Sequence, residues 1–378
     1  MRRIYDAIVV GSGPGGGSAA FFLGRAGLRV LVLERERLPR AKPCGGMLSA
    51  RLLQQLPPSL EGVVENEVEA VTYAFGQQRV HVPLAGRRMV SVRRERFDAS
   101  LLSQARAEVR DATPVRAVRQ VGNHFEVETD DGPFSAAYLI GADGANSVVS
   151  RSLGLRRNPP RAVAIEAEIQ APPHIAAAYR QAPLFAFGDL PYGYLWVFPK
   201  GDHLSVGVGQ FRRGSVADGH THLPTVLERA LANHGLSLNG AKVRGWPLPI
   251  YDPAQPLGAG RALLVGDAAR LVDPFDGEGI RFAIKSGRLA AQAVIAGKPE
   301  DYPNAVRQSI AGSHRHGESL MRLFYRFPRA CWLLGVRNPS ATHAFADCLE
   351  DRIGHGTVMF RLAATLPWHL VRLALGQG

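Results

Sequence analysis

Cysteine is scarce in this chain of 378 residues, and the three that occur, Cys44, Cys331 and Cys348, lie far apart. Such scattered thiols predict neither a disulfide framework nor a CxxC metal site, and they fit a reducing compartment. The first ten residues, MRRIYDAIVV, lead directly into a strand pattern without the apolar segment of a signal peptide. We therefore expect a cytoplasmic protein without a metal site.

Long apolar runs are also absent, and lysines are few. No window reaches the roughly 18 uninterrupted apolar residues of a membrane-spanning helix. The chain has forty arginines but only five lysines, and its formal net charge is +12. These arginines are spread along the whole length without a basic run interleaved with aromatics, so we expect no nucleic-acid partner. An anionic membrane surface suits this charge better, which predicts peripheral contact with the cytoplasmic membrane face. Nothing in the sequence indicates an oligomeric state.

The stretch from residue 5 to 34 has the pattern of a strand, a glycine turn, a helix and a second strand. Ala7–Val10 is a short β-branched apolar run typical of a buried parallel strand, and GSGPGG follows at once. Ser18–Leu23 reads as a helix with small residues that can pack close to a sheet. Leu28–Leu33 is a second apolar strand that ends on the acid Glu34.

Each part of this pattern suits an anionic dinucleotide. Gly11 permits the sharp turn, Gly13 lets the backbone approach a pyrophosphate, and Gly16 allows helix and strand to touch. The N–H groups and dipole at the helix start favour phosphate. Glu34, eighteen residues after Gly16, can accept a hydrogen bond from a ribose hydroxyl and disfavours a 2′-phosphate. The stretch predicts FAD or NAD rather than NADP, and the alternative is a βαβ unit without a ligand.

Two further stretches carry groups for the phosphates. Arg94 or Arg96, at the start of a helix, is a natural partner for a pyrophosphate, although either can be a solvated helix residue. A strand that ends in Gly141-Ala142-Asp143-Gly144 places a carboxylate and several N–H groups at the edge of a sheet. The alternative for this second motif is an ordinary Asp-Gly turn.

A third strand is followed by an acid and a glycine-rich helix start. Ala262–Val265 reads as a buried parallel strand that ends in Gly266-Asp267, and Asp267 can hold a ribityl hydroxyl. Pro274 and Gly277–Ile280 then open an apolar helix, whose free N–H groups can face negative charge that develops on a ring.

Two stretches are unusual for a plain nucleotide fold. The loop Lys42-Pro43-Cys44-Gly45-Gly46 is either a simple turn or a backbone that passes close to a flat ring with a thiol aimed at it. The strand that contains Tyr194, Trp196 and Phe198 alternates strictly, so these aromatics share one side and line either a core or a cavity.

Together, these motifs resemble the geranylgeranyl reductase family, whose flavoprotein fold is shared with aromatic hydroxylases of the para-hydroxybenzoate type. The resemblance covers the chain up to about residue 300. The nucleotide motifs are common to both groups, whereas the Cys44 loop and Tyr194-x-Trp196-x-Phe198-Pro199-Lys200 favour the reductases. The residues that the resemblance places in the FAD site are Gly11, Gly13, Pro14, Gly15, Gly16, Glu34, Arg35, Cys44, Gly45, Gly46, Arg94, Asp143, Gly144, Gly266, Asp267, Pro274, Gly277, Gly279 and Ile280.

The resemblance implies reduction of C=C bonds in a polyprenyl lipid, with hydride from N5 of reduced flavin and a proton from a nearby acid. Tyr194, Trp196 and Phe198 would line the prenyl tunnel, and Cys44 is the candidate catalytic residue, as proton donor or flavin-poising group. NADPH or a reduced ferredoxin-like protein would reduce the flavin transiently, since no second dinucleotide motif occurs. The alternatives are an FAD-dependent aromatic or lipid monooxygenase, a lycopene-cyclase-like or halogenase-like flavoprotein, and a non-catalytic flavin-binding protein.

The expected fold class is α/β. A discontinuous Rossmann-like FAD-binding domain comprises residues 1–66, 92–158 and 258–298, and an inserted substrate-binding sheet comprises 67–91 and 159–257. Residues 299–378 form a C-terminal helical region that carries no recognisable motif. Its segment Leu362–Leu375 is apolar but interrupted by a proline, a histidine and an arginine. It reads as ordinary helical packing or as a membrane-surface helix with Trp368 at the headgroups and Arg361 and Arg372 on its polar side.

Overall fold

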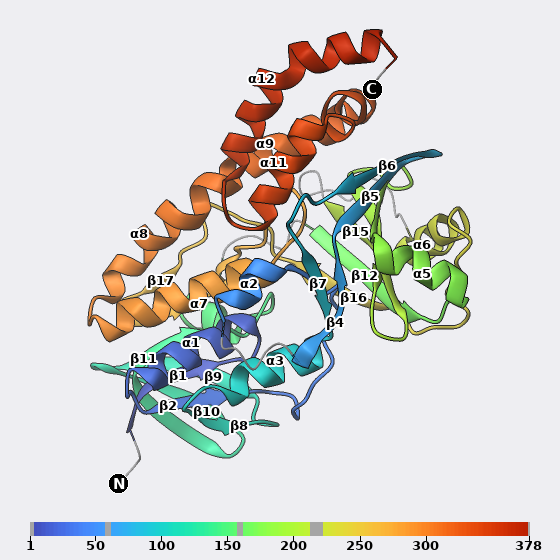
Figure 1. Cartoon of the computed structure of the whole chain (residues 1–378). Coiled ribbons are helices and arrows are strands. Elements are labelled where there is room, and N and C mark those ends of the chain that lie inside the picture. Colours follow the sequence, from blue (N-terminus) through green and yellow to red (C-terminus); the bar gives the residue numbers. More distant parts are fainter. Residues whose placement is uncertain (1–3, 57–61, 157–161, 212–221, 377–378) are drawn as a thin grey trace. The chain divides into compact units, whose positions relative to one another are not determined.

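The computed structural model describes residues 4–56, 62–156, 162–211 and 222–376 (Figure 1). These residues form a mixed α/β fold, as the sequence predicts. They fall into two compact units. Unit 1 consists of Met1–Lys42, Arg94–Pro160 and Leu248–Gly312, and unit 2 of Pro43–Arg93, Arg161–Pro247 and Ser313–Gly378. The boundary that we expect between residues 158 and 159 lies outside the described residues.

Unit 1 is built on a sheet in which β1 occupies a central place. The strand order is β17-β18-β11-β1-β2-β8, and β9 and β10 extend it through β11. Strand β1 pairs in parallel with β2 and β11, and β11 pairs in parallel with β18, so their carboxyl ends meet at one edge. The strands are β1 (Ile4–Val10), β2 (Val30–Leu33), β8 (Glu108–Arg110), β9 (Val115–Val121), β10 (His124–Thr129), β11 (Gly132–Gly141), β17 (Gly258–Ala259) and β18 (Ala262–Leu264).

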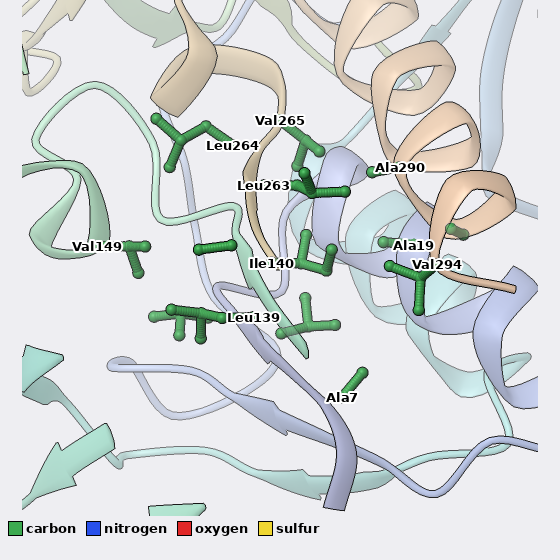
Figure 2. Close-up of a cluster of buried hydrophobic side chains, with 14 of the residues drawn as sticks. Ala7, Ala19, Leu139, Ile140, Val149, Leu263, Leu264, Val265, Ala290 and Val294 are labelled. Carbon is green, nitrogen blue, oxygen red and sulfur yellow. The ribbon is translucent and has the colours of Figure 1, made fainter. Parts of the chain in front are cut away.

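Two helices cover this sheet through residues without bulky side chains. Helix α1 (Pro14–Arg25) and helix α7 (Ile280–Ile295) lie side by side, because a Cβ on Gly287 would lie only 2.3 Å from the carbonyl oxygen of Gly15. Figure 2 shows Ala19 of α1 and Ala290 of α7 beside the strand residue Ile140. The other helices of unit 1 are α3 (Arg94–Ser103), α4 (Val148–Ser152), η2 (Gly266–Ala269), η3 (Pro299–Asp301), α8 (Tyr302–Val306) and η4 (Arg307–Ala311).

Unit 2 contains a seven-stranded sheet and a three-stranded sheet. The first has the order β16-β12-β15-β14-β13-β5-β6, and the second β3-β7-β4. The expected hairpin between residues 68 and 82 is present as β5 and β6, with Gly76 at a φ of 57° in its turn. The elements are β3 (Met47–Ser49), α2 (Ala50–Gln54), β4 (Val64–Val68), β5 (Ala70–Phe75), β6 (Gln78–Pro83), β7 (Met89–Val92), β12 (Ala162–Ile169), α5 (Pro173–Gln181), β13 (Leu184–Phe187), β14 (Gly193–Pro199), β15 (Leu204–Phe211), α6 (Leu223–Ala232) and β16 (Arg244–Leu248).

The C-terminal helices pack on the larger sheet of unit 2 through aromatic side chains. The Trp332 ring stacks on Phe75 at 5.8 Å, and its Nε1 donates a 2.6 Å hydrogen bond to Gln78. The Phe324 ring lies 5.0 Å from Phe187. These helices are α9 (Gly312–Arg326), α10 (Pro328–Cys331), η5 (Trp332–Val336), α11 (Pro339–Leu349) and α12 (His355–Ala374).

Helix α12 runs through Pro367 without interruption. Proline removes one N–H donor and leaves the carbonyl of Ala363 without its helical partner. Both residues are exposed, so water can satisfy that carbonyl. No helix in the described ranges is both long and apolar enough to cross a bilayer.

Candidate functional site

Unit 1 brings three loops together at the carboxyl edge of its parallel strands. The turn after β1 touches the turn after β11, since a Cβ on Gly11 would lie 2.4 Å from the carbonyl oxygen of Ala142. A Cβ on Gly15 would lie 3.1 Å from the Val265 side chain and 3.3 Å from the carbonyl oxygen of Ala283. Glycine motifs that are distant in the sequence thus meet where open α/β sheets bind their ligands.

The β1–α1 turn leaves room for a pyrophosphate. Gly11 has a φ of 98°, and a Cβ on Gly16 would lie 1.9 Å from the Gly11 carbonyl oxygen, so both positions require glycine. Gly13 is different, because the atom nearest to its added Cβ is a nitrogen of Arg40 at 3.5 Å. Helix α1 begins at Pro14 and has no side-chain cap in the described structure, so its first N–H groups can bind an anion.

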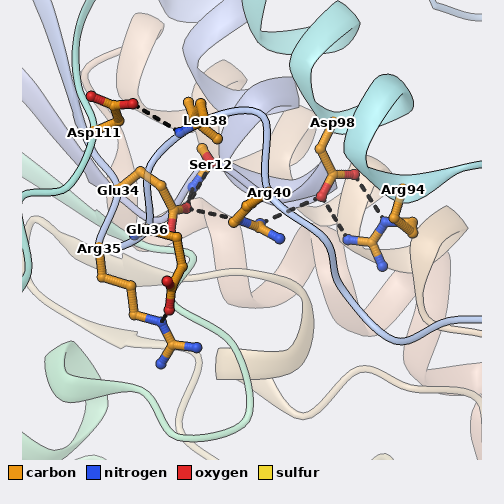
Figure 3. Close-up of polar contacts among 9 residues, drawn as sticks. All are labelled: Ser12, Glu34, Arg35, Glu36, Leu38, Arg40, Arg94, Asp98 and Asp111. Carbon is orange, nitrogen blue, oxygen red and sulfur yellow. Dashed lines mark hydrogen bonds and ion pairs between the residues drawn. The ribbon is translucent and has the colours of Figure 1, made fainter. Parts of the chain in front are cut away.

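Carboxylates and guanidinium groups alternate in a row beside this turn (Figure 3). Glu34, just after β2, accepts hydrogen bonds from the backbone N–H and hydroxyl of Ser12 at 2.9 and 2.6 Å. Arg40 lies 3.3 Å from Glu34 and 3.4 Å from Asp98. Arg94 then donates two hydrogen bonds to Asp98, of 2.9 and 2.8 Å. The predicted pyrophosphate partner Arg94 is therefore anchored by Asp98, and Arg40 connects it to Glu34.

Glu34 is held in its ionised form. Burial alone would raise its pKa, but the positive charge of Arg40 and the hydrogen bonds from Ser12 outweigh burial and lower the pKa. A carboxylate at this place suits a ribose hydroxyl. By contrast, the side chain of Arg35 is 55% exposed and lies 3.3 Å from Glu36. Its role in cofactor binding stays a prediction.

Asp143 has one engaged and one open oxygen. Oδ2 accepts hydrogen bonds from the backbone N–H groups of Val148 and Val149 at 2.6 and 3.1 Å, so it caps α4. Oδ1 is buried and has no hydrogen-bond partner among the described residues. Burial raises the pKa of Asp143 against the effect of these hydrogen bonds. Gly144, with a φ of 79°, completes the turn.

Asp267 lies between a lysine and the start of α7. Its Oδ2 is 3.6 Å from Nζ of Lys42. A Cβ on Gly279 would lie 3.5 Å from its Oδ1, so the helix that starts at Ile280 begins beside this carboxylate. Gly266 and Gly277, at φ values of 55° and 76°, shape the chain on either side, and Pro274 lies between them. Unit 1 therefore brings the glycine turns, Glu34, Asp143 and Asp267 to the carboxyl ends of its parallel strands.

In unit 2 the Cys44 loop packs on the aromatic face of the sheet. The ring of Trp196 lies 6.2 Å from that of Tyr194 and 6.3 Å from that of Phe198, as the alternation of β14 predicts. A Cβ on Gly45 would lie 2.7 Å from the Phe198 ring and 3.3 Å from Nε1 of Trp196. The two stretches that favour the reductases in the sequence thus form one surface.

Lys200, which directly follows β14, holds the loop in place. Its Nζ donates hydrogen bonds of 2.7 Å to the carbonyl oxygens of Gly45 and Val92. Gly46 has a φ of 61°, and a Cβ there would lie 2.6 Å from this nitrogen. Burial lowers the pKa of Lys200 to about 8. Replacing Gly45 or Gly46 would therefore displace either an aromatic ring or the lysine.

Glu166 is a buried acid that sequence reasoning misses. It lies on β12 opposite Gly207 of β15, and Gly207 lies opposite Trp196 of β14. Paired residues of neighbouring strands point to the same face, so Glu166 shares the face of Trp196. Burial raises its pKa to about 7, although the Cys44 backbone N–H and Lys200 favour the charged form. In the sequence, Glu166 is one of two acids in the otherwise apolar run AVAIEAEI, and the pattern alone does not tell which of them is buried.

The comparisons with known proteins agree with this geometry. Residues 4–297 match the family of FAD binding domains. The chain is 31% identical to a geranylgeranyl diphosphate reductase of Oryza sativa subsp. japonica, over 93% of this chain and 80% of that protein. It is 32% identical to a digeranylgeranylglycerophospholipid reductase of Thermoplasma volcanium, over 76% and 77%.

A solved structure has the same fold. The crystal structure of a geranylgeranyl bacteriochlorophyll reductase-like protein from Thermoplasma acidophilum matches 99% of each chain, with a TM-score of 0.76 and 22% identity. The uncapped start of α1, the space at Gly13 and the carboxylates of Glu34 and Asp267 fit the phosphates and hydroxyls of FAD. The Rossmann-like FAD-binding fold expected from the sequence is confirmed.

Proposed function

Because this chain belongs to the geranylgeranyl reductase family of FAD-dependent oxidoreductases, we propose that it saturates C=C bonds of a geranylgeranyl-type polyprenyl chain. FAD, when bound and reduced, supplies a hydride from N5 to one alkene carbon. The observation that carries the proposal is the packing of Gly45 against Phe198 and Trp196, which unites the two reductase-like stretches in unit 2. Relatives of this kind are named for prenyl diphosphates and prenyl glycerophospholipids, so the proposed substrate is a prenyl lipid.

In unit 1 each proposed cofactor contact uses a group that the structure leaves suitable for it. The backbone at Gly13 and the first turn of α1 bind the pyrophosphate. Arg94 supports the same phosphates while Asp98 fixes its orientation. Glu34 accepts a hydrogen bond from the ribose, and Asp267 accepts one from the ribityl chain.

In unit 2 the aromatic face binds the prenyl chain. An isolated alkene has no carbonyl that an enzyme can polarise, so its reduction depends on positioning and on exclusion of water. Tyr194, Trp196 and Phe198 supply large apolar surfaces for both tasks. Cys44 keeps the role that the resemblance implies, proton donation or poising of the flavin. NADPH or a ferredoxin-like protein is the proposed source of electrons.

The outer face of α12 is the proposed membrane contact. Phe360, Trp368 and Leu375 are 72%, 69% and 67% exposed, and with Val371 they fall on one stripe at helical spacing. An apolar stripe on a chain of net charge +12 suits the interface of an anionic bilayer. A lipid substrate could be collected there. Arg361, by contrast, lies 3.1 Å from Asp347 within unit 2.

Anaerobic turnover tests this function. The purified protein, reduced with dithionite, is mixed with geranylgeranyl diphosphate, and the products are analysed by mass spectrometry. We expect two hydrogens to be added per double bond while the flavin is reoxidised. A monooxygenase of the same fold would instead leave the prenyl chain unchanged without oxygen and would consume oxygen with its substrate. A Cys44→Ser variant that retains FAD then shows whether the thiol takes part in turnover.

A further inference from the structure

Glu166 lies on the aromatic face of unit 2. It has no role in the FAD contacts or in the prenyl contacts proposed above. A Cβ on Gly207 would lie 2.3 Å from the Trp196 ring, so the indole covers this glycine. Gly207 is the residue between Trp196 and Glu166 in the row across β14, β15 and β12. The indole therefore extends toward β12, and the Glu166 carboxyl borders the surface that is proposed to bind the alkene.

The Glu166 carboxyl is only partly satisfied by the protein. The backbone N–H of Cys44 hydrogen-bonds to it, which ties it to the Cys44 loop. Its Oε2 is buried and has no hydrogen-bond partner among the described residues, and the same is true of Nε1 of Trp196. Buried polar atoms without partners are rare and recur at sites of ligand binding or catalysis. One carboxyl oxygen is thus free to carry a proton that is not bound to another protein group.

The charged groups around Glu166 allow both of its protonation states. Lys200 and Arg244 favour the carboxylate, whereas Glu168 on the same strand disfavours it. Burial is the largest influence and raises the pKa of Glu166 to about 7. A general acid works best when its pKa lies close to the working pH, since it is then both present as the acid and able to release its proton.

We propose that Glu166 is a catalytic residue, the acid that donates a proton to the second alkene carbon during prenyl reduction. This inference rests on the proposed function. One alkene carbon gains the hydride with its electron pair, and the other gains the proton from the Glu166 O–H group. Two C–H bonds form while three bonds break: the π bond, the O–H bond and the N5–H bond that held the hydride on the reduced flavin, which is thereby oxidised. Glu166 is left as a carboxylate, which Lys200 and the Cys44 N–H stabilise until a proton from water restores the acid.

A carboxylic acid is better suited to this step than the Cys44 thiol. Carbon is a poor proton acceptor, so protonation of an alkene carbon calls for an acid whose proton is not engaged by another protein group, and the Oε2 atom of Glu166 meets this requirement. Cys44 then retains the flavin-poising role. Lys200 acts as a positioning residue, because it holds the loop through Gly45 and reaches the reaction only through Glu166.

The first test measures the carboxyl itself and needs no turnover. Infrared titration of the purified full-length protein should show a protonated carboxyl that ionises near pH 7. Glu166→Gln should abolish this band, because glutamine is isosteric and does not ionise. Glu168→Gln is the matched control, because Glu168 lies two residues further along β12, on the same face, and its side chain is 53% exposed. This variant should preserve the band. A wild-type spectrum without such a carboxyl overturns the proposal.

The second test follows reoxidation of the reduced flavin by geranylgeranyl diphosphate in single anaerobic turnovers. The wild-type rate should fall about tenfold per pH unit above pH 7, and E166Q should be slower by about 100-fold or more and insensitive to pH. E168Q should keep the wild-type rate at acidic pH, but its rate should begin to fall at a lower pH, because a like charge near Glu166 is removed. Glu166→Asp should recover part of the rate. An E166Q protein with the wild-type rate and profile overturns the proposal, provided its melting temperature and FAD content are unchanged. If E166Q does not fold, E166D replaces it in this test, because its shorter acid must change the rate and the pH profile.

A wild-type enzyme that reduces no prenyl substrate instead refutes the proposed function, and the infrared result remains valid by itself.

Discussion

Nζ of Lys200 lies 2.7 Å from the carbonyl oxygen of Gly45, a residue 155 positions earlier in the chain. Nζ donates a second hydrogen bond of the same length to the carbonyl oxygen of Val92, and the two bonds fix the Cys44 loop on the aromatic face of unit 2. Lys200→Met should leave both carbonyl oxygens without a donor, at a cost of roughly 2–4 kcal/mol in the free energy of unfolding. Chemical denaturation measures this loss, and Lys242→Met, at an exposed position, is the control. Equal stability of the two variants would contradict the anchoring role.

Gly13 and Gly16 should respond differently to alanine. A Cβ on Gly16 collides with the Gly11 carbonyl oxygen, whereas the nearest atom to a Cβ on Gly13 lies 3.5 Å away. Gly13→Ala should therefore fold like the wild type but bind FAD at least about tenfold more weakly, a loss of about 1.4 kcal/mol, because the methyl group occupies the phosphate approach. Gly16→Ala should instead lower the melting temperature. Calorimetry and the ratio of flavin to protein measure both effects, and a Gly13→Ala protein that keeps its full FAD affinity would refute this place for the pyrophosphate.

Glu34 should stabilise unit 1 in a pH-dependent way. Its pKa in the folded protein lies below the ordinary value of 4.5, so its contribution is present above that pH and is lost as the pH falls through the lower folded pKa. Glu34→Gln should cost roughly 1.5–3 kcal/mol at neutral pH, the usual value for hydrogen bonds to a charged group, and the difference from the wild type should shrink in acid. Unfolding curves across this range test it. Glu36→Gln, at a side chain 56% exposed, should show no such trend.

The exposed stripe of α12 should govern membrane binding. Replacing Phe360, Trp368 and Leu375 by serine removes most of the apolar surface of this stripe. Each of the three residues is at least 67% exposed, so the fold should be retained. The wild type should sediment with vesicles that contain anionic lipid, and the triple variant should remain in the supernatant. Phosphatidylcholine vesicles are the control for charge. Equal sedimentation of both proteins would remove α12 from the proposal.

The nucleotide unit could be predicted from the sequence because its signals are local. The turn from Gly11 to Gly16 and the strands on both sides follow each other without interruption, so spacing alone predicts β1, α1 and β2. The alternation of Tyr194, Trp196 and Phe198 likewise defines one face of β14. These features depend on neighbours within a few residues, and that is why they could be recognised before the fold was known.

Arg40 and Glu166 could not be found in the same way. Arg40 becomes significant because an irregular loop carries it between Glu34 and Asp98, and no periodicity describes that path. Glu166 becomes significant because β12 pairs with β15 in the register that places Gly207 beside it. The continuous course of α12 through Pro367 depended on exposure of the residue one turn earlier, which the local pattern does not reveal. Each of these depends on tertiary contacts.

Prenyl reduction by the bound flavin is tested by an anaerobic titration of the reduced holoenzyme with geranylgeranyl diphosphate, followed by mass spectrometry of the lipid. We expect one double bond to be saturated for each flavin that is reoxidised, so that the yellow colour returns in proportion to the hydrogens gained by the prenyl chain. Flavin that stays reduced in the presence of the prenyl substrate, with the lipid recovered unchanged, would contradict it.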